Sequence, residues 1–151
     1  MNYKNKDNMR NLLVLLFSFP IFIFAQDRIP EKYWIDDNTF EDIISPNGGF
    51  EDDYHEVIVI EFYADFNKSN AFSDWKKLDD LEGVSYYRID IATSPKLKKE
   101  LRIRMAPTIL LYLKGDAYIK FTAKAGLDLL CPVDYPKMLK AIEVVKQESA
   151  Y

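Results

Sequence analysis

Cysteine and histidine are almost absent from this sequence. The 151 residues include one cysteine, Cys131, and one histidine, His55. A single cysteine excludes an internal disulfide framework and a cysteine-rich zinc site. A single histidine leaves little material for a histidine-based metal site. We therefore predict that the protein holds no metal ion and no other cofactor.

Positive charge is also in the minority, because 20 Lys and Arg residues stand against 24 Asp and Glu residues and give a formal net charge of −4. The sequence has no basic stripe with interleaved aromatic residues, which argues against a nucleic-acid partner. Apolar residues make up 48% of the chain and aromatic residues 15%, enough for a packed core. The length indicates one domain rather than two.

The first 25 residues have the layout of a secretory signal. A short basic segment precedes the uncharged run 11–25, which reads NLLVLLFSFPIFIFA. This run is shorter than the roughly 20 apolar residues that span a membrane. We predict a signal peptide over 1–25 and a mature domain over 26–151, exported to a bacterial periplasm, to the cell surface or into the medium. Once the signal is cleaved, no stable membrane insertion is expected. An uncleaved signal anchor is the alternative.

The mature chain alternates between strand and helix patterns. Residues 57–64 read VIVIEFYA, a run typical of a strand buried on both faces. Apolar spacing and turn residues predict strands at 33–35, 57–64, 85–91, 108–113 and 117–121, and helices at 40–44, 70–81, 96–101 and 135–148. This order indicates an α/β fold with a central mixed sheet and helices on both faces.

Several segments resemble those of thioredoxin in amino-acid sequence, order and spacing. The sequence IEFYADF resembles the strand that leads into the family's active-site turn, and IRMAPT resembles the segment that carries its cis-proline. The matching segments are 36–40, 60–66, 87–90, 103–108 and 114–116, and together the resemblance covers about 33–146. It implies a thioredoxin-like three-layer sandwich.

The active-site turn departs from the family pattern. Where thioredoxins have Cys-x-x-Cys, this chain has Asn67-Lys68-Ser69-Asn70. The family's chemistry needs a thiolate nucleophile and a second thiol that resolves the mixed disulfide. Amides do neither, so we predict that no dithiol–disulfide exchange occurs here and that the protein is not an enzyme of this kind. Helix capping alone would account for Asn70.

Two further positions carry implications of the resemblance. The family has a buried acid where Glu61 stands, and without cysteines we expect Glu61 to be a structural acid bonded to a neighbour such as Tyr86. Pro107 matches the family's cis-proline, which exposes the backbone of the preceding residue, here Ala106, so that an extended peptide can pair with it. The alternative is a turn of the same geometry with no partner.

Two functions from different classes follow. The first hypothesis is a noncatalytic, chaperone-like binding module in which Phe66, Asn67, Asn70, Ala106 and Pro107 hold an extended segment of another exported protein. The second is a redox-related protein that acts through the lone thiol of Cys131, by mixed disulfide or by dimerisation. A lone cysteine is more often a small buried apolar residue. A purely structural domain is a third, weaker alternative.

Overall fold

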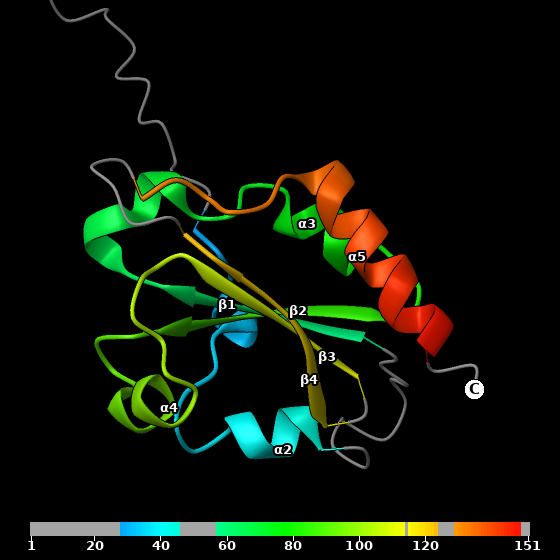
Figure 1. Ribbon diagram of the computed structural model, residues 1–151. Coiled ribbons are helices and arrows are strands. Elements are labelled where there is room, and N and C mark those ends of the chain that lie inside the picture. The colour runs from blue at the N-terminus through cyan, green and yellow to red at the C-terminus, as the bar shows by residue number, and fades with distance from the viewer. Residues whose placement is uncertain (1–27, 46–56, 114, 124–128, 149–151) are drawn as a thin grey trace, which may run out of the picture.

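Helices cover both faces of a four-stranded mixed sheet in the computed structural model (Figure 1). The structure describes residues 28–45, 57–113, 115–123 and 129–148. The predicted signal at 1–25 and His55 lie outside the described residues.

The sheet has the order β2-β1-β3-β4. Its strands are β1 (Val57–Tyr63), β2 (Val84–Asp90), β3 (Thr108–Leu113) and β4 (Asp116–Thr122). Strand β1 runs parallel to β2 and antiparallel to β3, and β4 returns antiparallel beside β3. The six residues at the start of β1 are all buried, which confirms the prediction of a central strand covered on both faces.

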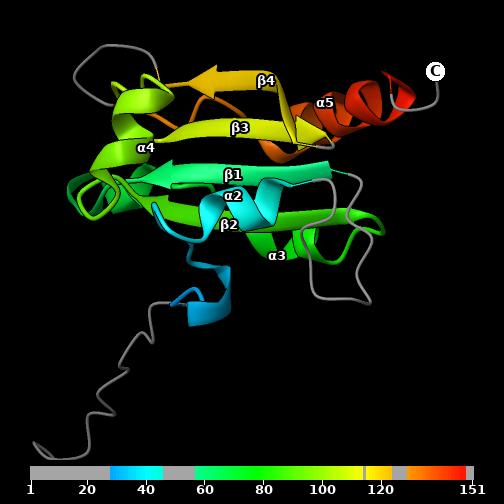
Figure 2. The same ribbon diagram turned by 90° about the horizontal axis from the view of Figure 1, so that it is seen from below.

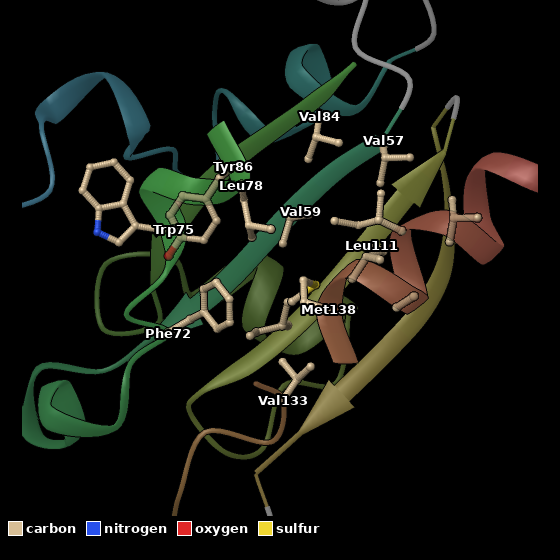
Figure 3. Packing of buried hydrophobic residues seen from close by; sticks show 14 of the residues in the cluster. Val57, Val59, Phe72, Trp75, Leu78, Val84, Tyr86, Leu111, Val133 and Met138 are labelled. Carbon is tan, nitrogen blue, oxygen red and sulfur yellow. The ribbon is translucent and has the colours of Figure 1, made fainter. Parts of the chain in front are cut away.

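Alternate side chains of β1 point into two separate cores, as the period of a strand requires. Val57 and Val59 belong to the core under α3 (Trp75–Asp79) and α5 (Tyr135–Glu148). Figure 3 shows this core, in which Met138 of α5 meets the sheet. Ile58, Ile60 and Phe62 belong to the core under α2 (Phe40–Ile44) and α4 (Pro95–Glu100). Figure 2 shows the two helix layers from a second direction.

Strand 33–35 was predicted but is reduced to a single parallel bridge between Trp34 and Arg88 of β2. A 3-10 turn, η1 (Glu31–Tyr33), occupies the preceding residues, because the Tyr33 amide donates to the Pro30 carbonyl at 3.1 Å. The bridge still places Trp34 against the outer edge of β2. The helices at 40–44 and 135–148 and the strand at 108–113 have the predicted bounds.

The helix caps come from two neighbouring aspartates rather than from the residues at the N-cap positions. Thr39 and Ser94 stand at the N-cap positions of α2 and α4 but make no side-chain cap bond. Instead, the Asp36 carboxylate accepts from the amides before α2, and these bonds lower its pKa. The Asp37 carboxylate accepts from the Lys96 and Leu97 amides of α4 at 3.0 and 2.9 Å. One loop thereby ties both helices of this layer together.

The predicted helix 70–81 is interrupted. A 3-10 segment, η2 (Asp65–Asn70), follows β1, and α3 begins only at Trp75. The cause is Phe72, whose amide donates to Glu61 Oε1 at 2.8 Å and whose carbonyl accepts from Arg88 Nη2 at 3.4 Å. With both of its backbone groups bonded to side chains of the sheet, Phe72 does not take part in a helical ladder. Helical spacing in the sequence contains no sign of this.

The end of α4 places an arginine where glycine is usual. The Ile103 amide donates to Lys98 O at 2.9 Å and the Arg102 amide to Lys99 O at 3.2 Å, which is the Schellman pattern. Arg102 occupies its left-handed position, with φ of 52°. A side chain with a Cβ is disfavoured in that conformation.

We predict that Arg102→Gly raises the free energy of unfolding by about 1 kcal/mol, because glycine adopts positive φ without a Cβ clash. Urea denaturation followed by circular dichroism measures it. Arg102→Ala is the matched control, since it removes the same charge and keeps the Cβ. An equal gain in both variants would show that charge, not backbone conformation, is responsible.

Candidate functional site

The segment that replaces the family's cysteine turn lies at the carboxyl ends of the parallel strands. Strands β1 and β2 run the same way, so the segments that follow them, η2 and α4, meet at one end of the sheet (Figure 1). The loop from α4 to β3 carries Ala106 and Pro107 to the same end. In open α/β sheets this is the usual location of a binding site.

Asn67 joins three segments of the chain. Its Nδ2 group donates to the carbonyl of Ala106 at 2.8 Å and to the carbonyl of Leu129 at 3.0 Å. Its Oδ1 accepts from Nδ2 of Asn70 at 2.7 Å. A carboxamide has two N–H donors and one carbonyl acceptor, and all three functions are used here. A thiol at this position would not hold two carbonyls in this way.

Asn70 does not cap a helix. It is the last residue of η2, five positions before α3 begins, and its amide group bonds to Asn67. The interpretation of Asn70 as a capping residue is therefore wrong. The two asparagines that stand at the cysteine positions act together as one hydrogen-bonded pair.

Pro107 follows a cis peptide bond, yet the backbone before it is not open to a partner. Ala106 is only 1% exposed, and its carbonyl is bonded to Asn67. The exposure of Ala106 that the resemblance implies is thus not found, and one of the two lone pairs of its carbonyl already accepts from Asn67. Pro107 is buried as well, and its carbonyl accepts from the Ala123 amide at 3.1 Å.

Two large apolar side chains flank the Asn67 bridge. Phe66, which precedes Asn67, is 78% exposed, and Leu130, which follows Leu129, is 62% exposed. The hydrogen bond from Asn67 to Leu129 brings the segment that carries Phe66 next to the segment that carries Leu130. Phe66 was predicted as a site residue and Leu130 was not. No sequence signal pairs two segments 62 positions apart, the separation of the residues in that bond.

A buried ion pair lies beneath this surface. Glu61 is fully buried, and its Oε2 accepts from Nη2 and Nε of Arg88 at 2.8 and 3.1 Å. The predicted hydrogen bond from Tyr86 to Glu61 is confirmed. Burial, together with the Glu61 carboxylate, raises the pKa of the Tyr86 hydroxyl well above its usual value, so the hydroxyl keeps its proton and donates. Arg88 was missed because the strand pattern of 85–91 gives no reason to bury a base.

Aromatic rings enclose the Arg88 guanidinium. Its Cζ lies 5.0 Å from the ring centre of Tyr63, 5.7 Å from that of Trp34 and 5.9 Å from that of Tyr86. The Arg88 side chain is 8% exposed. Cation–π contacts and the carboxylate offset the loss of hydration of the guanidinium. This pair therefore supports the site from below rather than offering a charge to a ligand.

We predict that Arg88→Met lowers the free energy of unfolding by about 3–5 kcal/mol, because it leaves the Glu61 carboxylate buried without a counter-ion. The double variant Glu61→Gln, Arg88→Met removes both charges and is expected to recover part of the loss. Urea denaturation compares the three proteins. A loss below about 1 kcal/mol in Arg88→Met would contradict a supporting role for the pair.

Cys131 lies near the site in space although it is far from it in sequence. It follows Leu129, the partner of Asn67, by two positions, and its Sγ donates to the carbonyl of Val133 at 3.3 Å. The side chain is partly buried and packs against the core under α5. Burial raises the pKa of its thiol. Because only the thiolate attacks a disulfide, this environment disfavours redox chemistry.

Cys131 should react slowly with iodoacetamide at pH 8 in the folded protein, because the raised pKa leaves little thiolate and the side chain is half covered. Mass spectrometry measures the modified fraction over time, with and without urea. Much faster modification in urea is expected. Equal rates in the two conditions would return Cys131 to consideration as a reactive thiol.

Within the described ranges, no group of three His, Cys, Asp or Glu side chains could hold a metal ion. No helix in the same part of the chain is long and apolar enough to cross a membrane.

Known proteins match this chain by structure only. No protein-family model and no curated protein matches the sequence. A mutant thioredoxin from Halobacterium salinarum matches with a TM-score of 0.58 and 16% identity, over 75% of this chain and 88% of that one. Thioredoxin f from spinach chloroplast, long form, matches at 0.56 and 20%, over 75% and 84%. The oxidised thioredoxin of Plasmodium falciparum matches at 0.54 and 16%, over 74% and 94%.

These identities establish the fold alone. The chain has the thioredoxin fold, an α/β arrangement with a mixed sheet between helices. It contains a single cysteine and therefore no Cys-x-x-Cys pair.

Proposed function

We propose that this chain is a noncatalytic, chaperone-like binding module that holds an extended segment of another exported protein. The binding surface is formed by Phe66 and Leu130, on either side of the Asn67–Asn70 pair, with Pro107 beneath it. We also propose that residues 1–25 are an export signal, so that the chain and its partner meet outside the cytoplasm.

The exposure of Phe66 and Leu130 carries this proposal. Among the large apolar side chains of the described residues, these two are the most exposed. Leaving apolar area in water forgoes about 25 cal/mol per Å², and aromatic residues are enriched in interfaces. A partner that covers both side chains would explain why the chain keeps them exposed beside the Asn67 bridge.

Rigidity of the surface supports the same function. Asn67 ties η2 to the loop before β3 and to the segment after β4, so Phe66 and Leu130 keep their relative positions without a partner. A surface held in its bound arrangement loses less conformational freedom on association. Because the Ala106 carbonyl is already bonded, we propose that the partner is held by side-chain contacts rather than by a backbone ladder at Ala106.

The alternative function through Cys131 has less support. Its thiol lies two residues from the surface, which is the one observation in its favour. The same thiol is partly buried and has a raised pKa, and the chain has no second cysteine to resolve a mixed disulfide. A binding role requires neither a thiolate nor a resolving thiol.

We predict that Phe66→Ser, Leu130→Ser lowers the affinity for the natural partner by at least about tenfold, since a few buried apolar anchors dominate most interfaces. Affinity capture from the exported proteins of the source organism identifies the partner, and titration calorimetry then compares the variants.

The matched control for this test is Tyr118→Ser, Val144→Ser, which removes the two other exposed large apolar side chains, at 45% and 50% exposure. The control should bind as the unmodified chain does. Binding that is indifferent to the change at Phe66 and Leu130 would place the partner elsewhere and refute the proposal.

A further inference from the structure

Basic residues gather around α4 at the end of the sheet that carries the binding surface. The stretch 96–104 contains five bases and one acid, Glu100. Lys120 of β4 joins them, because its Nζ donates to the carbonyl of Leu101 at 3.1 Å. We call this group the α4 basic face; its members are Lys96, Lys98, Lys99, Arg102, Arg104 and Lys120, all exposed.

Among the residues that the structure describes, no salt bridge joins any of these six bases to a carboxylate. The salt bridges from Lys77 to Asp74 and from Arg88 to Glu61 lie away from this face. The chain as a whole has more acidic than basic residues. The six bases of this face therefore differ in sign from the net charge of the protein. Concentrated, unpaired positive charge on an acidic protein attracts anionic groups.

The face adjoins the proposed binding surface. Arg104 lies two residues before Ala106, whose carbonyl is bonded to Asn67 beside Phe66. In Figure 1, α4 and the loop that leads to β3 lie at the end of the sheet toward which β1 and β2 both run. An extended segment that covers Phe66 therefore reaches the α4 basic face within a few residues.

Arg102 adds an independent observation. It keeps a charged side chain at φ of 52°, a conformation that favours glycine. Residues with a strained backbone cluster at functional sites. The face thus retains a base at a position where the fold itself would be served better by glycine.

From these observations we infer that the segment held by this protein is acidic: its carboxylates contact the α4 basic face while its apolar side chains cover Phe66 and Leu130. This inference rests on the proposed binding function and adds the charge of the partner. Opposite charge at the rim of an interface raises the association rate and selects among partners. Salt weakens such contacts, since the screening length is about 10 Å at 0.1 M.

A random library of peptides of about 12 residues, displayed on phage and panned on the full chain, tests the inference. Enriched peptides should combine acidic with apolar residues. One enriched peptide, labelled with fluorescein, is then titrated at about 20 mM and about 500 mM salt. We expect Lys98→Gln, Lys99→Gln, Arg102→Gln to weaken its binding by about tenfold at low salt and much less at high salt.

The matched control is Lys76→Gln, Lys137→Gln, Lys140→Gln, which removes three charges from α3 and α5 on the opposite face of the sheet and should leave binding unchanged. Enriched peptides without an acidic bias, bound through Phe66 and Leu130, would overturn the inference and leave the binding function standing. A library that yields no peptide would refute both. Binding to vesicles of phosphatidylcholine and phosphatidylglycerol, abolished by the α4 substitutions while peptides show no acidic bias, would assign the face to a membrane and also overturn the inference.

Discussion

The ion pair between Glu61 and Arg88 is the interaction on which the site's geometry depends. It joins β1 to β2 at a buried position, where an unpaired charge would be severely destabilising, and its two partners also bind the amide and the carbonyl of Phe72. Because of these two bonds, the segment after β1 forms a short 3-10 helix instead of a long α-helix. The chain has the thioredoxin fold, and the segment after β1 is organised around one buried salt bridge.

The rebuilt turn puts Asn67 where its carboxamide reaches the Ala106 and Leu129 carbonyls. The replacement of thiols by amides is therefore more than a loss of chemistry, because the amide supplies two donors that tie neighbouring loops together. The tie occupies a backbone carbonyl that would otherwise be available to a partner. It also ties the segment of Phe66 to the segment of Leu130, and the proposed binding function rests on this connection.

Much of the fold was predictable from the residues, because apolar runs such as 57–64 and the spacing in 135–148 are determined by local periodicity. The site was predictable only in part. The order of the motifs was enough to select Phe66, Asn67 and Pro107 as candidate site residues. The interruption of the helix at Phe72 was not predictable, because it depends on side chains 11 and 16 positions away. Leu130 depends on a contact across 62 positions. Local patterns carry no information on such pairings, and a base buried at Arg88 contradicts the ordinary preference of that residue type.

Asn67 has a structural role, because it connects two neighbouring loops by hydrogen bonds. Hydrogen exchange of its side-chain Nδ2 protons, followed by nuclear magnetic resonance, tests this most directly, with the exposed carboxamide of Gln147 as the reference. The two Nδ2 protons of Asn67 are each bonded to a backbone carbonyl. We therefore expect them to exchange far more slowly than the side-chain amide protons of Gln147. Equal exchange rates at the two side chains would contradict it.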